Sequence, residues 1–393
     1  MTLSSHLYFL VPAFWACFAV VVYTYAGYPL ILWVLSRLAG NRQEPADLRG
    51  VDLPTVSLLI AAYNEEAVIE ERVRNAMALD YPSDRFEIVI ASDGSSDSTA
   101  DIVARFAPQG VRSFAYNENR GKATVLNCTV PELSGKLILF SDANTRMDAQ
   151  AVRRLVRWFQ DPQVGAVSGK LVLVDSETGR NADGMYWKYE TFLKQCEGKL
   201  GALLGANGAI YAMRRELYEP IPPTTVDDFL IPLQARLRSN CRIVFDSSAT
   251  AFEETAPDAL AEFHRRARFG AGGFEAVGLL WRLLDPRRGW ICFTFVSHKI
   301  LRWACPLFAL AMLLATVLMV QSTLYRGLLL GQLCFYGLSL GVIFVPTAAK
   351  VWKPLRLAGM FTLMNVALLI GFCRWLSRSQ GGTWKPARTP VRN

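Results

Sequence analysis

The sequence predicts a mostly parallel α/β sheet domain flanked by membrane-spanning α-helices. Apolar residues concentrate at both ends of the chain, and short β-rich runs alternate with amphipathic helical stretches in the middle. The chain has 393 residues, 52% of them hydrophobic and 19% charged, which suffices for one large α/β domain and several apolar helices. We expect an anchor and linker over 1–50, a soluble domain over 51–285, and an interfacial helix, about three membrane helices and a basic tail over 286–393.

Residues 7–38 are predicted to anchor the chain in a membrane. The stretch is too long for the apolar core of a signal peptide, and no small-residue cleavage site ends it. Basic residues follow it at Arg37, Arg42 and Arg49, so the positive-inside rule places the soluble domain in the cytoplasm. We therefore expect a multi-pass protein of the cytoplasmic (inner) cell membrane.

Three further apolar stretches are each long enough to cross a hydrocarbon core of roughly 30 Å. The segment before them, 291–302, is typical of an interfacial helix with His298 and Lys299 toward the headgroups. Three crossings would place the basic tail outside, so either one stretch is re-entrant or the tail breaks the charge rule. Buried core helices of a soluble protein are the alternative, which length and lack of charge disfavour. The stretches are 303–320, 324–346 and 357–376.

The composition excludes several other classes of protein. Three histidines and eight cysteines without any CxxC spacing argue against a zinc site, a haem site and a disulfide framework. The net charge of +8 comes largely from lysines and arginines beside the apolar stretches, which are typical topology signals and lipid contacts. Because no basic stripe is interleaved with aromatic residues, we expect no nucleic-acid partner.

Polar motifs follow three of the β-rich runs in the soluble domain. Since ligands of parallel sheets bind outside the carboxyl ends of the strands, the motifs are expected to converge on one edge. Acidic side chains there repel one another unless a cation offsets them, which favours bound Mg²⁺ or Mn²⁺ with a diphosphate. Taken singly, these motifs would equally be turns and helix N-caps. The runs are 55–62, 86–91, 111–116, 136–140 and 164–173, and the motifs are 61–66, 92–99 and 141–145.

Together, these motifs resemble those of the inverting family 2 glycosyltransferases, which have the GT-A fold. The resemblance covers residues 55 to about 273, and the flanking helices are similar to those of membrane-bound cellulose, hyaluronan and poly-N-acetylglucosamine synthases. It implies a nucleotide-sugar donor, with Ala62, Tyr63 and Glu65 framing the nucleobase and ribose and with Asp93 on the uracil or ribose side. Lys122 matches a family position close to the donor, although a lysine there would also suit a solvated helix start.

Asp142-Ala143-Asn144 stands where the family carries its DxD motif. The resemblance implies that Asp142 coordinates the divalent ion that bridges the diphosphate oxygens. Asn144 replaces the third carboxylate, so it would offer a carbonyl oxygen or hold a bound water.

On the acceptor side, residues 205–209 resemble the family's acceptor loop, which implies acceptor contact by Asn207; the glycines would equally serve a close strand crossing. Asp227 and Asp228 resemble the family's Glu-Asp pair. Asp228 matches the general base, which removes the proton of the attacking hydroxyl. The same pair also suits the acidic first turn of a helix over 229–237.

Residues 265–273 line up with the QxxRW signature of the processive synthases. Arg268 would match the arginine that contacts the diphosphate, and Phe269 would replace the tryptophan that stacks on the acceptor sugar. Arg265 replaces the glutamine. Because of these two replacements, processivity is kept only as an alternative. A basic patch near lipid phosphates is the alternative interpretation of these arginines.

The expected function is inverting transfer of a sugar, from a UDP-sugar, to a polysaccharide or polyprenyl-linked acceptor at the cytoplasmic membrane face. One alternative is a processive synthase that also exports its polymer, with a partner subunit supplying the channel. The other is an inactive membrane scaffold that still binds nucleotide sugars. The three aspartates Asp93, Asp142 and Asp228 favour an enzyme.

Overall fold

The computed structural model describes residues 3–40, 44–46, 48, 53–175, 181, 184–254, 259–344 and 353–383. The chain divides into two compact units. The sheet unit comprises Leu35–Thr255, Gly278–Cys292 and Gly381–Asn393, and the helical unit comprises Met1–Val34, Ala256–Val277 and Phe293–Gln380. The expected bounds of the soluble domain, 51–285, stay a prediction.

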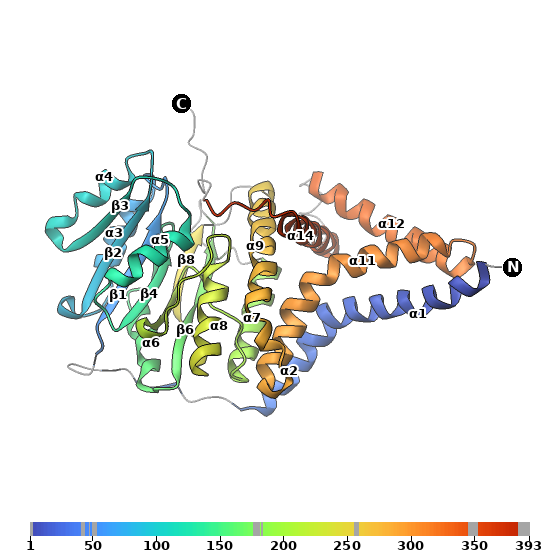
Figure 1. Ribbon diagram of the computed structural model, residues 1–393, viewed down its shortest axis with the longest axis horizontal. Helices are drawn as coiled ribbons and strands as arrows, with labels where there is room; N and C mark the ends of the chain where they lie inside the picture. Colours follow the sequence, from blue (N-terminus) through green and yellow to red (C-terminus); the bar gives the residue numbers. More distant parts are fainter. Residues whose placement is uncertain are drawn as a thin grey trace. The chain divides into compact units, whose positions relative to one another are not determined.

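The sheet unit is built on one eight-stranded sheet with the order β3-β2-β1-β4-β7-β6-β8-β5 (Figure 1). The first four strands in this order are parallel, and β7 then runs antiparallel to both β4 and β6. The predicted α/β sheet is therefore confirmed as a mixed one. Its strands are β1 (Val56–Ala62), β2 (Phe86–Asp93), β3 (Val111–Tyr116), β4 (Leu137–Asp142), β5 (Arg146–Met147), β6 (Val164–Val174), β7 (Tyr211–Arg214) and β8 (Arg242–Glu254).

Helices lie beside this sheet and bury its strands. Every residue of β1 is buried, as expected for a central parallel strand with both faces covered. An apolar stripe on α3, which includes Ile69, Val73 and Ala76, packs into the same core. The α-helices of the sheet unit are α3 (Ile69–Met77), α4 (Thr99–Ala104), α5 (Lys122–Thr129), α6 (Ala151–Val156), α7 (Met185–Lys199) and α8 (Asp227–Ser239).

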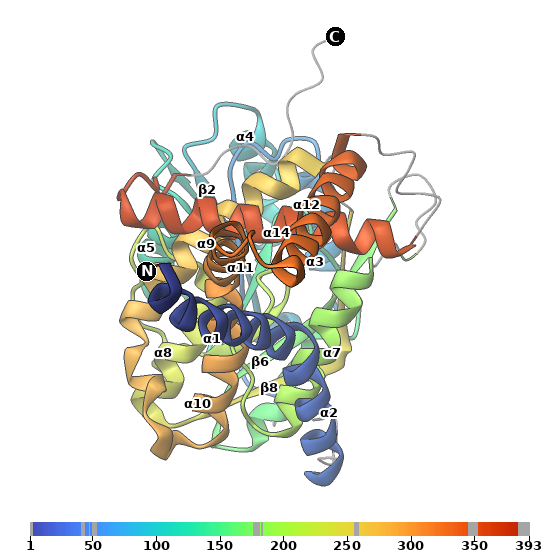
Figure 2. The ribbon, with the colours of Figure 1, turned by 90° about the vertical axis from the view of Figure 1, so that its right-hand side faces the viewer.

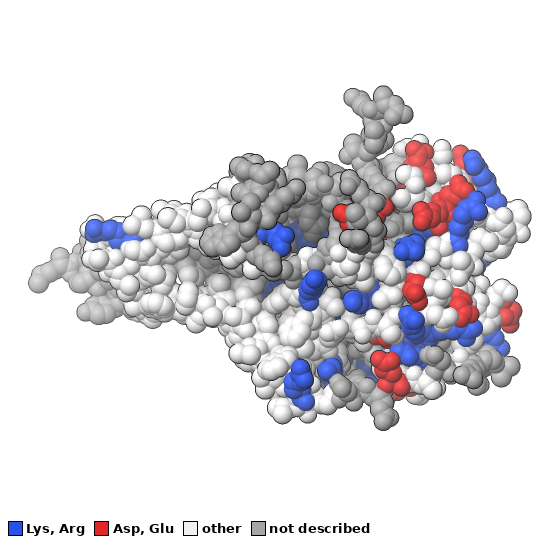
Figure 3. Space-filling view, turned by 180° about the vertical axis from the view of Figure 1, so that it is seen from behind, with Lys and Arg blue, Asp and Glu red and all other residues white. Residues whose placement is uncertain are grey.

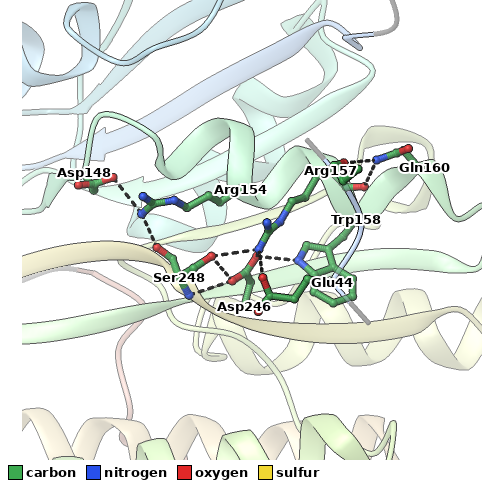
Figure 4. A network of polar contacts seen from close by, with 9 residues as sticks. Glu44, Asp148, Arg154, Arg157, Trp158, Gln160, Asp246 and Ser248 are labelled. Atoms are coloured by element: carbon green, nitrogen blue, oxygen red, sulfur yellow. Dashed lines mark hydrogen bonds and ion pairs between the residues drawn. The ribbon is translucent and has the colours of Figure 1, made fainter. Parts of the chain in front are cut away.

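A polar network attaches the linker ahead of β1 to the rest of the sheet unit (Figure 4). Arg157 follows α6, and its guanidinium contacts Glu44 of the linker at 2.8 Å and Asp246 of β8 at 3.0 Å. The indole N–H of Trp158 donates to the same Asp246 carboxylate at 2.7 Å. Because Asp246 is 2% exposed, these donors satisfy a charge that would otherwise be costly to bury.

Three helices in the described part of the chain are long and apolar enough to cross a membrane, namely Phe9–Leu38, Trp290–Leu318 and Pro354–Leu376. In Figure 3 the charged side chains gather over the sheet unit, whereas the helical unit shows few. α12 is not among the three candidate spans, so the predicted crossing over 324–346 stays a prediction. The remaining α-helices of the described residues are α1 (Leu3–Val22), α2 (Tyr28–Leu38), α9 (Ala259–Leu279), α10 (Trp290–Thr294), α11 (Leu301–Leu318), α12 (Thr323–Phe344) and α14 (Lys353–Leu376).

Within the helical unit, α1 packs along α11, and α12 packs against α14 and crosses it (Figures 1 and 2). α10 and α11 are joined by the π-helical turn η10 (Phe295–Ile300) into one helix. The expectation that His298 of this turn faces the headgroups is wrong, because His298 is 3% exposed. Its ring lies 6.0 Å from that of Tyr28 and its Nε2 lies 3.2 Å from Arg302. Burial against these two side chains replaces the expected contact with lipid.

Glycines allow α9 to approach its neighbours in the helical unit closely. A Cβ added at Gly273 would lie 2.5 Å from the ring of Trp303, and one added at Gly371 of α14 would lie 2.7 Å from the Ala267 carbonyl oxygen. Such separations leave no room for a side chain. Gly273 of α9 and Gly371 of α14 therefore allow close helix packing within the helical unit.

Candidate active site

The carboxyl ends of β1, β2 and β4 lie at one edge of the sheet. Ala61 of β1 is paired with Asp142 of β4, and Ala62 is paired with Ser92 of β2. Because the three strands are parallel and in this register, the motifs that follow them emerge side by side. The sheet topology thus brings the predicted donor and metal residues to one edge.

The loops that follow β1 and β2 interlock through side-chain hydrogen bonds. Asn64 has a φ of 54°, in the left-handed region that asparagine tolerates, and its Oδ1 accepts the backbone N–H of Ser96 at 2.8 Å. The next backbone N–H, that of Glu65, donates to Thr99 Oγ1 at 2.8 Å. These bonds hold Tyr63 and Glu65, both predicted to contact the donor, next to the loop after β2.

Asp93 orders the loop that leads into α5. The side chain is fully buried, and its two carboxylate oxygens accept the backbone N–H groups of Arg120 and Gly121 at 2.9 and 2.7 Å. Charge-assisted hydrogen bonds of this kind are stronger than neutral ones. Asp93 therefore fixes the backbone immediately before Lys122, and the predicted contact between Asp93 and the donor stays a prediction.

Lys122, the first residue of α5, bridges two carboxylates. Its Nζ lies 2.7 Å from Asp142 Oδ1 and 3.0 Å from Asp227 Oδ2, and 21% of its side chain is exposed. Burial opposes the charged ammonium, but Asp142, Asp227 and Asp228 together raise the pKa of Lys122 well above its ordinary value. The lysine is therefore a fixed cation at the centre of the site and not a solvated helix start.

Asp227 and Asp228 are the first two residues of α8, where the helix dipole favours acidic groups. Asp228 Oδ2 accepts the backbone N–H of Gly208 at 2.9 Å. A Cβ added at Gly208 would lie 3.4 Å from Asp142 Oδ2 and 3.4 Å from Asp228 Oδ2. The carboxylates predicted to bind the metal and to act as the base thus face each other across a glycine.

The pKa of Asp228 suits a proton acceptor. Desolvation of the side chain, followed by repulsion from Asp227, raises the pKa of Asp228 from 3.8 to about 6, while Lys194 and Lys122 act in the opposite direction. A general base works best when its pKa lies near the working pH, because it is then both ionised and basic. This carboxylate can therefore take up a proton near neutral pH.

Lys194 of α7 is a site residue that the sequence did not reveal. Its Nζ donates to the Ala206 carbonyl oxygen at 3.0 Å and contacts Asn207 Oδ1. Asn207, which was predicted to contact the acceptor, also donates from Nδ2 to the Gly169 carbonyl oxygen at 2.7 Å. The lysine thus supports the loop beside Asp228 from a helix that carries no recognisable motif.

Arg268 and Phe269 lie on α9, which belongs to the helical unit. The guanidinium carbon of Arg268 lies 5.7 Å from the centre of the Phe269 ring, and Phe269 is 38% exposed. Their predicted roles toward the diphosphate and the acceptor sugar stay predictions.

Asp142 is the residue best suited to hold a divalent ion. Its side chain is 34% exposed, and while Oδ1 contacts Lys122, Oδ2 points toward Gly208. Asn144, two residues on, is exposed. No group of three His, Cys, Asp or Glu side chains that could hold a metal occurs among the described residues. Mg²⁺ commonly binds through one or two carboxylates plus substrate phosphates, so this set fits an ion that arrives with a diphosphate.

Tyr211 of β7 contributes a buried hydroxyl near the acidic pair. Burial, with Asp227 and Asp228, raises the pKa of Tyr211 well above its usual range. The hydroxyl oxygen has no hydrogen-bond partner among the described residues. An unpaired buried hydroxyl lowers stability, so Tyr211→Phe is expected to increase the free energy of unfolding by about 1 kcal/mol.

Thermal unfolding of the detergent-solubilised protein checks this expectation. Tyr218→Phe is the matched control, because the Tyr218 hydroxyl donates to Asn127 Oδ1 at 2.8 Å and its loss should lower stability by about 1 kcal/mol. If both variants were destabilised to the same degree, the Tyr211 hydroxyl would have to make a hydrogen bond in the folded protein.

Comparisons with known proteins find similarity to one family of enzymes over part of the chain. The family model "Glycosyl transferase family 2" matches residues 57–221. The beta-monoglucosyldiacylglycerol synthase of Trichormus variabilis is 28% identical over 261 residues, which cover 64% of this chain and 55% of that protein. The poly-beta-1,6-N-acetyl-D-glucosamine synthase of Staphylococcus aureus is 27% identical over 246 residues, which cover 59% of this chain and 57% of that protein. Residues 57–221 are therefore similar to family 2 glycosyltransferases, and the chain spans about half the length of these relatives.

A solved structure shares the fold over most of the chain. It is the mannosyltransferase PcManGT from Pyrobaculum calidifontis in complex with GDP-Man and Mn²⁺, with a TM-score of 0.71 and 22% identity. The match covers 93% of this chain and 99% of that one. The GT-A-like fold that the resemblance implied is thereby confirmed.

Proposed function

We propose that the protein is an inverting glycosyltransferase that moves a sugar from a uridine diphosphate sugar to a polysaccharide or lipid-linked acceptor. The proposal rests on two observations: Lys122, Asp142 and Asp228 all lie close to Gly208, and Lys122 also contacts Asp227. This arrangement supports the proposal, because an ammonium group that could bind a diphosphate lies close to a carboxylate suited to proton removal. The names of the relatives, a glycolipid synthase and a polysaccharide synthase, support the acceptor class.

The chemistry is a single displacement at the anomeric carbon. Asp228 removes the acceptor hydroxyl's proton as its oxygen attacks from the face opposite the leaving diphosphate. Lys122 offers positive charge to the phosphate oxygens as negative charge grows on them. A divalent ion held by Asp142, with Asn144 nearby, would add further neutralisation of the leaving group when bound.

The candidate membrane spans support an acceptor that is itself held at the membrane. Anchoring the enzyme beside such an acceptor raises its effective concentration and removes part of the entropic cost of the encounter. Under this proposal the sheet unit lies on the cytoplasmic face of the inner membrane, in agreement with the arginines that follow the first span.

Transfer by purified full-length protein in proteoliposomes tests the proposal. We expect labelled sugar to move to lipid or polymer from UDP-sugars, with Mn²⁺ or Mg²⁺ increasing the rate, and little transfer from GDP- or dTDP-sugars. Equal transfer rates from the three kinds of nucleotide sugar, or no transfer from any of them, with and without metal, would remove the basis for the donor assignment.

A further inference from the structure

Arg72 of α3 is a buried arginine close to the candidate active site. It lies within the apolar stripe of the helix, between Ile69 and Ala76, and is 2% exposed. Burial lowers the pKa of Arg72 to about 10, although Asp142 acts in the opposite direction. The guanidinium therefore stays charged at neutral pH.

The guanidinium bonds to the end of strand β4, where Asp142 is located. Its NH2 group donates to Ser141 Oγ at 3.0 Å, and its Nε donates to the Asp142 carbonyl oxygen at 3.3 Å. Ser141 Oγ in turn donates to the Ala209 carbonyl oxygen at 2.8 Å. One arginine thus ties the backbone of Asp142 to the residue that follows Gly208.

Asn75, one turn further along α3, bonds to Met147, five residues after Asp142. Its Oδ1 accepts the Met147 backbone N–H at 2.9 Å, and its Nδ2 donates to the Met147 carbonyl oxygen at 3.0 Å. The NH1 group of Arg72 donates to the same Asn75 Oδ1 at 3.1 Å. Helix α3 therefore contacts both ends of the segment from Ser141 to Met147, which we call the DAN loop.

Stability alone does not account for a charge at this place. Buried charges are costly to desolvate, and an apolar side chain of similar size is often as stable or more stable. The other arginine of this helix, Arg74, is exposed and pairs with Glu70 on the surface. Arg72 differs from Arg74 in that its guanidinium contacts the DAN loop.

We propose that Arg72 and Asn75 are positioning residues that hold the DAN loop so that Asp142 presents its carboxylate to the donor diphosphate and its ion. The proposal rests on the proposed function for its purpose, but the restraint of the loop is a property of the protein alone. Partners that orient metal ligands typically change metal affinity or activity by about 10- to 100-fold when they are replaced.

Hydrogen exchange of the full-length protein without donor tests the restraint directly. We expect Arg72→Met and Asn75→Ala to increase exchange about tenfold or more at amides 141–147, with strand β1 unchanged, because the loop opens locally without global unfolding. Arg74→Met, on the same helix, is the control and should leave the loop unchanged. Unchanged exchange of the loop in both test variants would overturn the proposal.

Binding of Mn²⁺ with UDP and of UDP-sugar, followed calorimetrically, tests the consequence for Asp142. Arg72→Met should weaken this binding by about 10- to 100-fold with little change in Tm, and Arg72→Lys should recover part of the lost affinity. Binding equal to that of the wild type would overturn the link to Asp142. Absence of nucleotide binding by the wild-type protein itself would instead count against the proposed function, and the exchange measurement would still decide the restraint.

Discussion

Replacement of Asp228 by asparagine is expected to reduce sugar transfer by about 10²- to 10⁴-fold, the usual contribution of a general base. The amide oxygen can still accept the Gly208 N–H that Asp228 Oδ2 accepts at 2.9 Å, so the loop should keep its conformation. The amide cannot take up the proton of the acceptor hydroxyl. We therefore expect a loss in kcat with nearly unchanged affinity for the donor.

Initial rates and donor binding of the same protein preparation separate these two effects. Asp101→Asn, an exposed carboxylate in the first turn of α4, is the matched control and should retain full activity. A variant Asp228→Asn that keeps half of the wild-type rate would contradict the assigned role. Another group would then have to accept the proton.

The pH dependence of the wild-type enzyme offers an independent check. The base acts in its ionised form, and desolvation with repulsion from Asp227 raises the pKa of Asp228 to about 6. Activity should therefore be constant above this pH and fall as the pH drops through about 6. A rate that falls only near pH 4 would indicate an ordinary exposed carboxylate.

Replacement of Lys122 by methionine is expected to have the second largest effect. It leaves Asp142, Asp227 and Asp228 without the cation that lies 2.7 and 3.0 Å from the first two. Loss of one partner of a largely buried ion pair should lower the free energy of unfolding by about 3 kcal/mol. Donor affinity should fall by about 10- to 100-fold, since a hydrogen bond to a charged group contributes about 1.5–3 kcal/mol.

The same variant should also move the pH profile. Lys122 lowers the pKa of Asp228, so without it the acid limb should shift to higher pH. Tm, donor binding and the pH profile of the rate measure the three effects, with Lys136→Met, an exposed lysine, as the control. A Lys122→Met protein with an unchanged pH profile would show that the ammonium does not influence the base.

The sheet and its motif-bearing edge could be predicted because their signals are local. The β-rich runs that end near Ala62, Asp93 and Asp142 are strands, although β2 and β4 each extend two residues beyond the expected end to include the aspartate. Strand β7 was not predicted, since four residues between a glycine loop and a 3-10 turn give no periodic signal. Its antiparallel pairing with β4 depends on contacts distant in sequence.

The residues that support the site were harder to find. Lys194 lies on a helix without a motif, and only the fold brings its ammonium to Asn207. For Arg72 the sequence does give a signal, because an arginine within an apolar helical stripe must find hydrogen-bond partners inside the protein. The sequence could not say that those partners are Ser141 and the Asp142 carbonyl group.

The division of the chain has a practical consequence for work on the sheet unit. The polypeptide passes between the two units at five places, after residues 34, 255, 277, 292 and 380. No single cut therefore separates the two units, because after any one cut at least one fragment still contains residues of both. A fragment that contains the complete sheet unit must therefore join three separate stretches of the chain.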